Sequence, residues 1–173
     1  MTEPRWVTGL FPDGASVEHA WKAALARGYG SDDMNVIMSD ETRRRLIEGD
    51  TVIHTEVGNK AAEGAGIGGA LGGAVGALAA ALVAVGTSLV LPGLGLVVAG
   101  PVAAAFAGAG AGAAGGGLVG ALIGWGIPEE RIQEVESGLR NGGILVGLRP
   151  RTDDDALHFQ DTWRAANGQV VRG

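Results

Sequence analysis

Residues 64–90 read GAGIGGALGGAVGALAAALVAVGTSLV, and residues 100–126 read GPVAAAFAGAGAGAAGGGLVGALIGWG. These two segments decide the fold, because residues 64–128 contain no charged side chain and interrupt an otherwise ordinary chain. Twenty of the 32 glycines lie between Gly64 and Gly126, whereas all the charged residues lie in the flanks. Because the flanks have the charge density of a soluble domain, we interpret the uncharged block as an insertion into such a domain.

Small residues recur at every fourth position of both segments. The glycines of this series are Gly64, Gly68, Gly72 and Gly76 in the first segment and Gly100, Gly108, Gly112, Gly116, Gly120 and Gly124 in the second. Since four residues make nearly one helical turn, each series predicts a helix face almost without side chains, against which another backbone can pack closely. Glycine inside a helix costs about 1 kcal/mol relative to alanine. Its repeated use therefore favours a packing role, and we expect these faces to mediate homo-oligomerisation.

A turn signature, Leu91-Pro92-Gly93-Leu94-Gly95, separates the two segments. The sequence therefore predicts an inserted glycine-zipper helical hairpin over residues 61–127, with helices at about 64–90 and 100–126 and a turn at about 91–95. Each helix would be roughly 40 Å long. A bilayer core needs about 20 residues, so the hairpin is long enough to cross a membrane and return. Trp125 lies near one predicted boundary, where indole anchors are common.

Two features of the same block also suit other environments. Alanine and glycine give modest hydrophobicity for a membrane-spanning helix, and the turn has no polar loop to hold it in water. A hairpin that dips into one leaflet, or one buried inside a large soluble assembly, would have the same composition. The sequence leaves these three alternatives open.

The N-terminal flank has the pattern of a strand, a helix and a second strand, followed by two weaker elements. The predicted elements are a strand at Arg5–Phe11, a helix at Ser16–Arg27, a strand at Met34–Met38, a short helix at Glu41–Glu48 capped by Asp40, and a strand at Thr51–Val57. Gly28 is a plausible C-cap of the first helix. Met1–Phe11 lacks the features of an export signal, so we expect this flank to stay in the cytoplasm.

The C-terminal flank resumes the soluble pattern. A helix is predicted to begin at Pro128, to bury Ile132, Val135 and Leu139, and to end at Asn141-Gly142-Gly143. The later elements are a strand at Ile144–Leu148, a helix opened by Thr152, and a short run at Gln169–Arg172. Neither flank buries a large core alone. Residues 1–60 and 128–173 are therefore predicted to form one α+β domain, a ferredoxin-like sandwich (βαβ…αβαβ) with helices on one face of a four-stranded sheet.

Composition excludes several kinds of chemistry. A formal net charge of −6 and a pI near 5.0 disfavour a general nucleic-acid binder, and the absence of cysteine excludes thiolate chemistry. The match of Gly64–Gly69 to G-x-G-x-x-G is attributed to chance, because no strand directly precedes it and no acidic residue follows at the required distance. We expect no cofactor.

The remaining polar candidates have simpler explanations. His19, His54 and His158 lack a third metal ligand nearby, Asp153–Asp155 has the pattern of a helix N-terminus, and Ser16 is explained by capping rather than as a nucleophile beside His19. We expect no catalytic residue, no metal site and no enzymatic activity. Arg43–Arg45 precedes the block by about 20 residues; contact with anionic lipid and a solvated helix face are equally good interpretations.

Several stretches resemble one bacterial family. Val7–Gly28 with the strand Met34–Met38, Ala61–Leu71, Leu91–Gly95, and above all Gly126–Leu148 (GIPEERIQEVESGLRNGGILVGL) are similar to the general stress proteins that contain a heat-induced stress protein (YflT-type) domain. The resemblance implies a stress-related protein, of a kind often labelled a membrane protein, and it brings no catalytic residue with it.

The sequence as a whole predicts a non-enzymatic, stress-related protein that self-associates through glycine-zipper helices. Its partners would be copies of itself and membrane lipid, not nucleic acid, and it would lie in or on the cytoplasmic membrane with both termini in the cytoplasm. One alternative is a cytoplasmic, soluble particle or filament that buries the apolar hairpins inside. A second alternative is a small-molecule-binding regulatory module.

Overall fold

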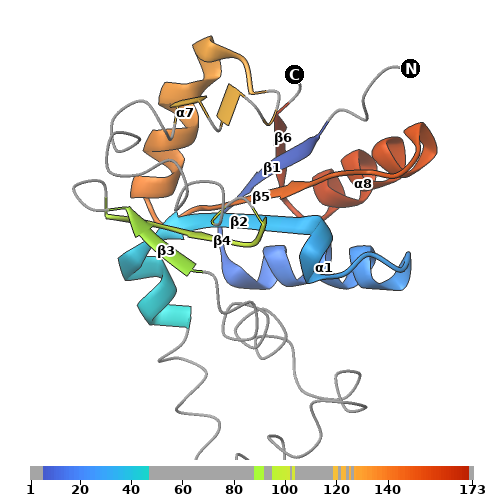
Figure 1. Cartoon of the computed structure of the whole chain (residues 1–173), viewed down its shortest axis with the longest axis horizontal. Coiled ribbons are helices and arrows are strands. Elements are labelled where there is room, and N and C mark those ends of the chain that lie inside the picture. Colours follow the sequence, from blue (N-terminus) through green and yellow to red (C-terminus); the bar gives the residue numbers. More distant parts are fainter. Residues whose placement is uncertain are drawn as a thin grey trace, which may run out of the picture.

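The computed structural model describes residues 6–46, 88–91, 95–101, 103, 119–120, 122–123, 125 and 127–171. Within these residues the chain is a mixed α+β structure (Figure 1). Its elements are β1 (Val7–Phe11), α1 (Gly14–Ala26), β2 (Met34–Ser39), β3 (Ser88–Leu91), β4 (Leu96–Ala99), α7 (Glu129–Arg140), β5 (Ile144–Leu148), α8 (Asp153–Ala165) and β6 (Gln169–Val171), with a 3-10 turn at Ser31–Asp33 and a helical stretch over residues 40–46. The described strands form one sheet in the order β3-β4-β2-β5-β1-β6, and every pairing is antiparallel.

Local signals position the helices of the flanks. Asp13 caps α1 by accepting a hydrogen bond from the Ser16 backbone N–H at 2.8 Å, so Ser16 is the donor in the cap and not the capping residue. The predicted stop at Gly28 is confirmed by its φ of +81°, which glycine adopts without strain. Thr152 caps α8 through its side-chain oxygen, as predicted, and accepts the Asp155 N–H at 3.1 Å.

Helix α7 also follows the sequence prediction closely. It begins at Glu129, with Pro128 as the N-cap, and buries Ile132, Val135 and Leu139. Its end uses Gly142, whose φ is +94°, and β5 follows over the predicted range Ile144–Leu148.

The helices cover both faces of the sheet, which corrects the prediction of helices on one face. Figure 1 shows α7 on the side opposite α1 and α8. Val146 of β5 belongs to the core shared with α1 and α8, whereas the adjacent Leu145 belongs to the core shared with α7. Adjacent strand residues point to opposite faces, and β5 is buried at all five positions. A strand that is apolar on both faces needs a layer on each side.

The predicted helical hairpin is wrong over residues 88–100. Ser88–Leu91 and Leu96–Ala99 are antiparallel strands, and β4 pairs with β2 from Val36↔Ala99 to Ser39↔Leu96. Leu91 pairs with Leu96, so a turn does lie at about 91–95, but it joins two strands rather than two helices. The backbone of β4 satisfies the free edge of β2, and this pairing overrides helical periodicity. The sheet therefore has six strands in the described part, not four.

The remainder of the predicted hairpin, 61–87 and most of 102–126, lies outside the described residues, as does the predicted strand Thr51–Val57. Among the helices that the structure does describe, none combines the length and apolar character needed to span a bilayer.

Candidate functional site

Two of the ten glycines predicted to mediate packing lie in the described part of the chain. Gly100 is not in a helix: its φ is +109°, and a Cβ there would stand 2.5 Å from the Met34 carbonyl oxygen. Glycine at this position lets the end of β4 lie against the backbone of β2, so the prediction that Gly100 belongs to a helix face is wrong. The others, apart from Gly120, lie outside the described residues: Gly64, Gly68, Gly72, Gly76, Gly108, Gly112, Gly116 and Gly124.

Gly120 lies in a helical turn, as the sequence predicts. It is exposed, and no atom stands within 4 Å of the position that a Cβ would take. Ile123, three residues later, is 49% exposed, whereas Leu122 is fully buried in the core on the α7 face and Val119 packs against that core. This turn therefore attaches to the sheet through Val119 and Leu122 and presents Gly120 and Ile123 outward.

Trp125 does not have the surroundings of a membrane anchor. Its side chain is 3% exposed, and its ring stacks on Trp6 with centroids 5.7 Å apart. A Cβ on Gly147 would stand 2.9 Å from this indole, so the glycine makes room for it on β5. Thr8 donates a hydrogen bond to the Trp125 carbonyl oxygen at 3.2 Å. The indole packs on the sheet, which corrects its predicted place at a bilayer boundary.

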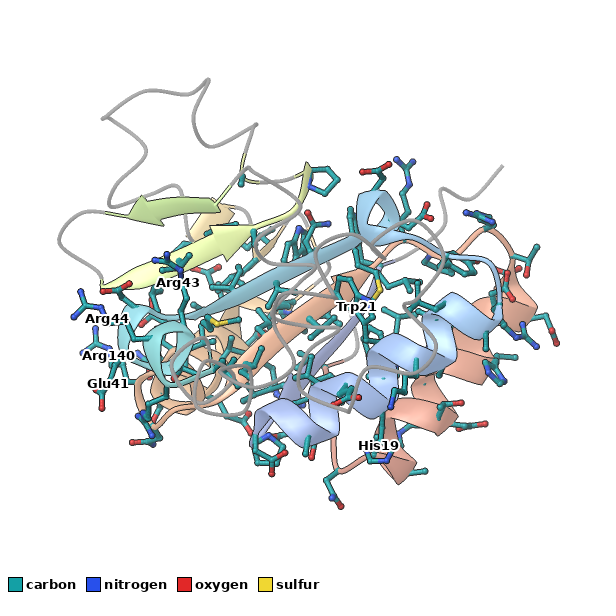
Figure 2. All side chains as sticks on the ribbon, turned by 90° about the horizontal axis from the view of Figure 1, so that it is seen from below. His19, Trp21, Glu41, Arg43, Arg44 and Arg140 are labelled. Carbon is teal, nitrogen blue, oxygen red and sulfur yellow. The ribbon has the colours of Figure 1, made fainter. Side chains whose placement is uncertain are left out.

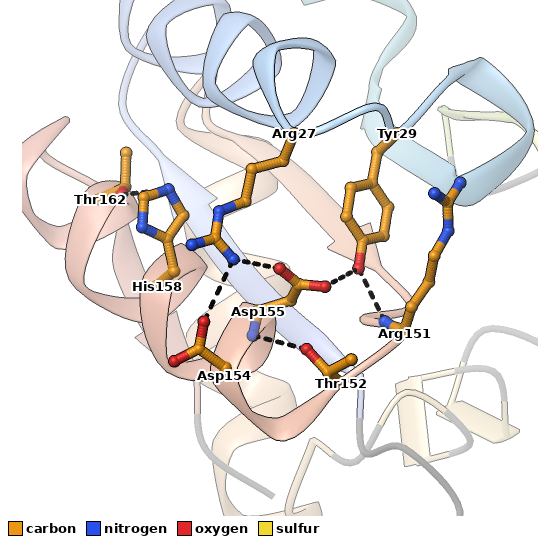
Figure 3. A network of polar contacts seen from close by, with 8 residues as sticks. All are labelled: Arg27, Tyr29, Arg151, Thr152, Asp154, Asp155, His158 and Thr162. Atoms are coloured by element: carbon orange, nitrogen blue, oxygen red, sulfur yellow. Dashed lines mark hydrogen bonds and ion pairs between the residues drawn. The ribbon is translucent and has the colours of Figure 1, made fainter.

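The most connected polar group in the described residues is the Tyr29 clamp, made of Arg27, Tyr29, Arg151 and Asp155 (Figure 3). The Tyr29 hydroxyl donates to Asp155 Oδ2 at 2.7 Å and accepts the Arg151 backbone N–H at 2.7 Å. Arg27 donates to the other oxygen of Asp155. The clamp therefore ties the end of α1 to the start of α8, although the residues it joins lie 126 and 128 positions apart in sequence.

Electrostatics in the clamp follow from these contacts. The hydrogen bond from Tyr29 and those from Arg27 and Thr152 hold the pKa of Asp155 below its usual value, against a smaller opposing effect of burial. Burial raises the pKa of Tyr29, and the neighbouring Asp155 carboxylate adds to this. A neutral phenol and an ionised carboxylate are thus both favoured around neutral pH.

The clamp is a structural connection rather than a reactive centre. Both oxygens of Asp155 accept hydrogen bonds, and the Tyr29 hydroxyl donates and accepts, so both groups are already engaged within the fold. The Arg151 guanidinium lies 4.4 Å from the Tyr29 ring centroid and donates to Asp33 at 2.9 Å. Sequence reasoning identified Asp153–Asp155 as a helix start but missed the partner Tyr29, the only tyrosine of the chain.

The histidines have ordinary surroundings where they are described. His19 Nδ1 lies 3.0 Å from the Ala15 carbonyl oxygen, and His158 Nε2 lies 3.5 Å from the Thr162 hydroxyl; His54 is outside the described residues. The buried carboxylate of Glu18 is paired with Lys22 at 2.7 Å. No cluster of potential metal ligands occurs in the part of the chain that the structure describes.

A second polar group, the basic end, comprises Arg43, Arg44, Arg45 and Arg140. Arg43 and Arg44 both pair with Asp40, at 3.3 and 2.6 Å, and Arg45 pairs with Glu41 at 3.1 Å. These pairs are internal to the helical stretch 40–46, so Arg43–Arg45 forms a solvated helix face, one of the two interpretations of the sequence.

Comparison with known proteins adds no assignment: no family model, no curated protein and no solved structure matches the chain.

Proposed function

We propose that the protein is a non-enzymatic, self-associating protein whose uncharged block supplies the contacts between copies, in or on the cytoplasmic membrane. The observation that carries this proposal is the turn at residues 119–123. Leu122 is buried against the sheet while Gly120 and Ile123 face outward, so a smooth, apolar helix face is not used by the domain's own core. Two such faces can pack with their backbones close together.

The finer parts of the proposal concern fold and physiology. The order β6-β1-β5-β2, with α1 and α8 packed together on one face, supports a ferredoxin-like split βαβ unit formed by the two flanks. In this proposal β3, β4 and α7 are additions to that unit, and the uncharged block is the insertion that carries the zipper. The stress-related role rests on the resemblance of Val7–Gly28 and Gly126–Leu148 to the general stress proteins.

The test places bulk on the glycine face. Gly112→Leu with Gly116→Leu should lower the mass of the assembly, because leucine prevents close approach of the helices, and Gly120→Leu should do the same at the described turn. Mass photometry of the full chain measures the assembly, and far-UV circular dichroism checks the domain. Since Gly120 has open space around it, its substitution should leave the α+β domain folded.

Gly30→Leu is the matched control. A Cβ at Gly30 would also have no atom within 4 Å, but this glycine lies in the turn after α1, remote in sequence from the uncharged block. Its substitution should leave the assembly unchanged. A wild-type chain that is monomeric, or glycine variants with the same mass as the wild type, would refute self-association through the zipper.

A second candidate is the soluble particle or filament with the apolar block inside. Ala103, Leu122 and Trp125 are all buried in the core on the α7 face, and this favours a block that folds back on its own domain. Lysis without detergent separates the two candidates: a large species in the high-speed supernatant supports the soluble assembly, and recovery in the membrane fraction supports the first proposal.

A further inference from the structure

The basic end lies where several strands of the sheet begin or end. Ser39, the last residue of β2, pairs with Leu96, the first residue of β4, and Met38 pairs with Ile144, the first residue of β5. The helical stretch 40–46 follows β2 directly, and the Thr42 N–H donates to Ser39 Oγ at 3.0 Å. The arginines of this stretch are therefore held at a fixed edge of the domain.

Arg140 joins them from another element. The Arg45 guanidinium lies 3.9 Å from the position that a Cβ of Gly142 would take, which brings helix 40–46 against the end of α7. Arg140, two residues earlier, is exposed at this end, close to Arg43 and Arg44 in Figure 2. Two elements about 100 residues apart in sequence thus contribute to one basic surface.

The positive charge of this surface is only partly neutralised. Four guanidinium groups face two carboxylates, those of Asp40 and Glu41. The Arg44 and Arg45 side chains are 70% and 66% exposed, so their pairs are in water and contribute little to stability. At the other end of β2 and β5 the balance is reversed: three arginines, Arg27, Arg149 and Arg151, are outnumbered by the acids at 32–33 and 153–155. The domain is electrically polar along its strands.

The uncharged block meets the domain at the basic end. The Asp40 N–H donates to the Gly95 carbonyl oxygen at 2.9 Å, and Leu91 and Leu96 are the paired residues that flank the β3–β4 connection. An apolar chain segment beside a basic surface suits a bilayer, where headgroups and acyl chains are adjacent. A nucleic acid would offer phosphate without an apolar layer, and the net charge of −6 opposes it.

We propose that Arg43, Arg44, Arg45 and Arg140 form a docking surface for anionic lipid headgroups, with the acidic end of the sheet directed away from the membrane. The inference rests on the membrane part of the proposed function and does not require the glycine zipper. It identifies the lipid class by charge and the surface by its residues.

Vesicle co-sedimentation of the full-length chain tests the surface. The wild type should bind vesicles that contain phosphatidylglycerol more strongly than vesicles of phosphatidylcholine alone, and added salt should reduce the difference. The triple variant Arg43→Gln, Arg44→Gln, Arg140→Gln should lose this preference by on the order of 100-fold. Conversely, Glu41→Gln should strengthen binding, because it removes a carboxylate from the surface; this gain remains informative if the triple variant folds poorly.

The matched control removes the same charge elsewhere. Arg131→Gln, Arg149→Gln, Arg164→Gln lies outside the basic end and should keep most of the preference. Equal losses in the two triple variants, or a wild type that binds neither vesicle or both equally, would overturn the inference. Equally tight, salt-sensitive binding to duplex DNA would replace it with a phosphate-binding surface.

Assembly measured without vesicles separates the two proposals. If vesicle preference is absent while the assembly mass is unchanged, only the lipid inference fails. If the chain is monomeric but keeps its preference for anionic vesicles, only the self-association fails.

Discussion

The two ends of the sheet use charged residues differently. At the Tyr29 clamp, Arg27 and Asp155 lie 128 positions apart in sequence, and the Tyr29 side chain that joins them is buried. At the basic end, Arg44 pairs with Asp40 one helical turn away, and its side chain is mostly exposed. Ion pairs between distant elements stabilise the fold, whereas pairs within one exposed helix leave most of their charge available to a partner. A polar group's partners in sequence are therefore more informative than its charge.

The largest expected difference between the two ends is in packing beneath the clamp. Phe159 is fully buried and meets the Tyr29 ring edge-on, with centroids 5.1 Å apart. Phe159→Ala should lower the free energy of unfolding by about 3–5 kcal/mol, because it opens a cavity between α1 and α8. Arg44→Gln, at the basic end, should change it by less than about 0.5 kcal/mol. Urea denaturation of both variants checks the pair, and similar losses would contradict the distinction between the ends.

A smaller effect is expected from the hydroxyl alone. Tyr29→Phe keeps the ring but leaves the Arg151 N–H and one oxygen of Asp155 without their partner. It should cost about 1–2 kcal/mol, the usual effect of losing hydrogen bonds at a buried site. The same urea experiment measures it. A variant as stable as the wild type would show that the clamp is satisfied by water and does not tie α1 to α8.

The elements that are predictable from sequence carry their own local signals. Gly28, Gly142 and Thr152 mark helix ends by backbone geometry or capping, which depend on few neighbours. The strand Leu96–Ala99 has no such signal, because its pairing with β2 joins residues about 60 positions apart and its apolar composition equally suits a helix. For the same reason, the sequence pattern places Gly100 on a helix face, although the backbone of Met34 explains it.

The second core on the α7 face is partly predictable from sequence. The run Ile144–Leu148 has an apolar residue or glycine at every position rather than at alternate ones, which indicates burial on both faces. The Tyr29 clamp is not predictable in this way, since Tyr29 and Asp155 are 126 residues apart and each has a simpler local interpretation. Only the folded chain brings the phenol and the carboxylate together.

The smallest expected effect, the pH dependence of the clamp, distinguishes its two titrating groups. The pKa of Asp155 is lower in the folded chain than its usual 3.8, so its stabilising contribution is present above that pH and is lost as the pH falls through the folded value. The pKa of Tyr29 is raised above 10.0, so its contribution is present below pH 10.0 and is lost as the pH rises through the folded value. Urea denaturation of the wild type and Tyr29→Phe at acid and alkaline pH isolates these contributions from the background of other groups. The variant should lose the alkaline decline assigned to Tyr29 and should show a shallower acid decline, because the phenol is the main cause of the low pKa of Asp155. Parallel curves at both extremes would mean that the two groups do not interact in solution, and the contrast between the ends of the sheet would then rest on packing alone.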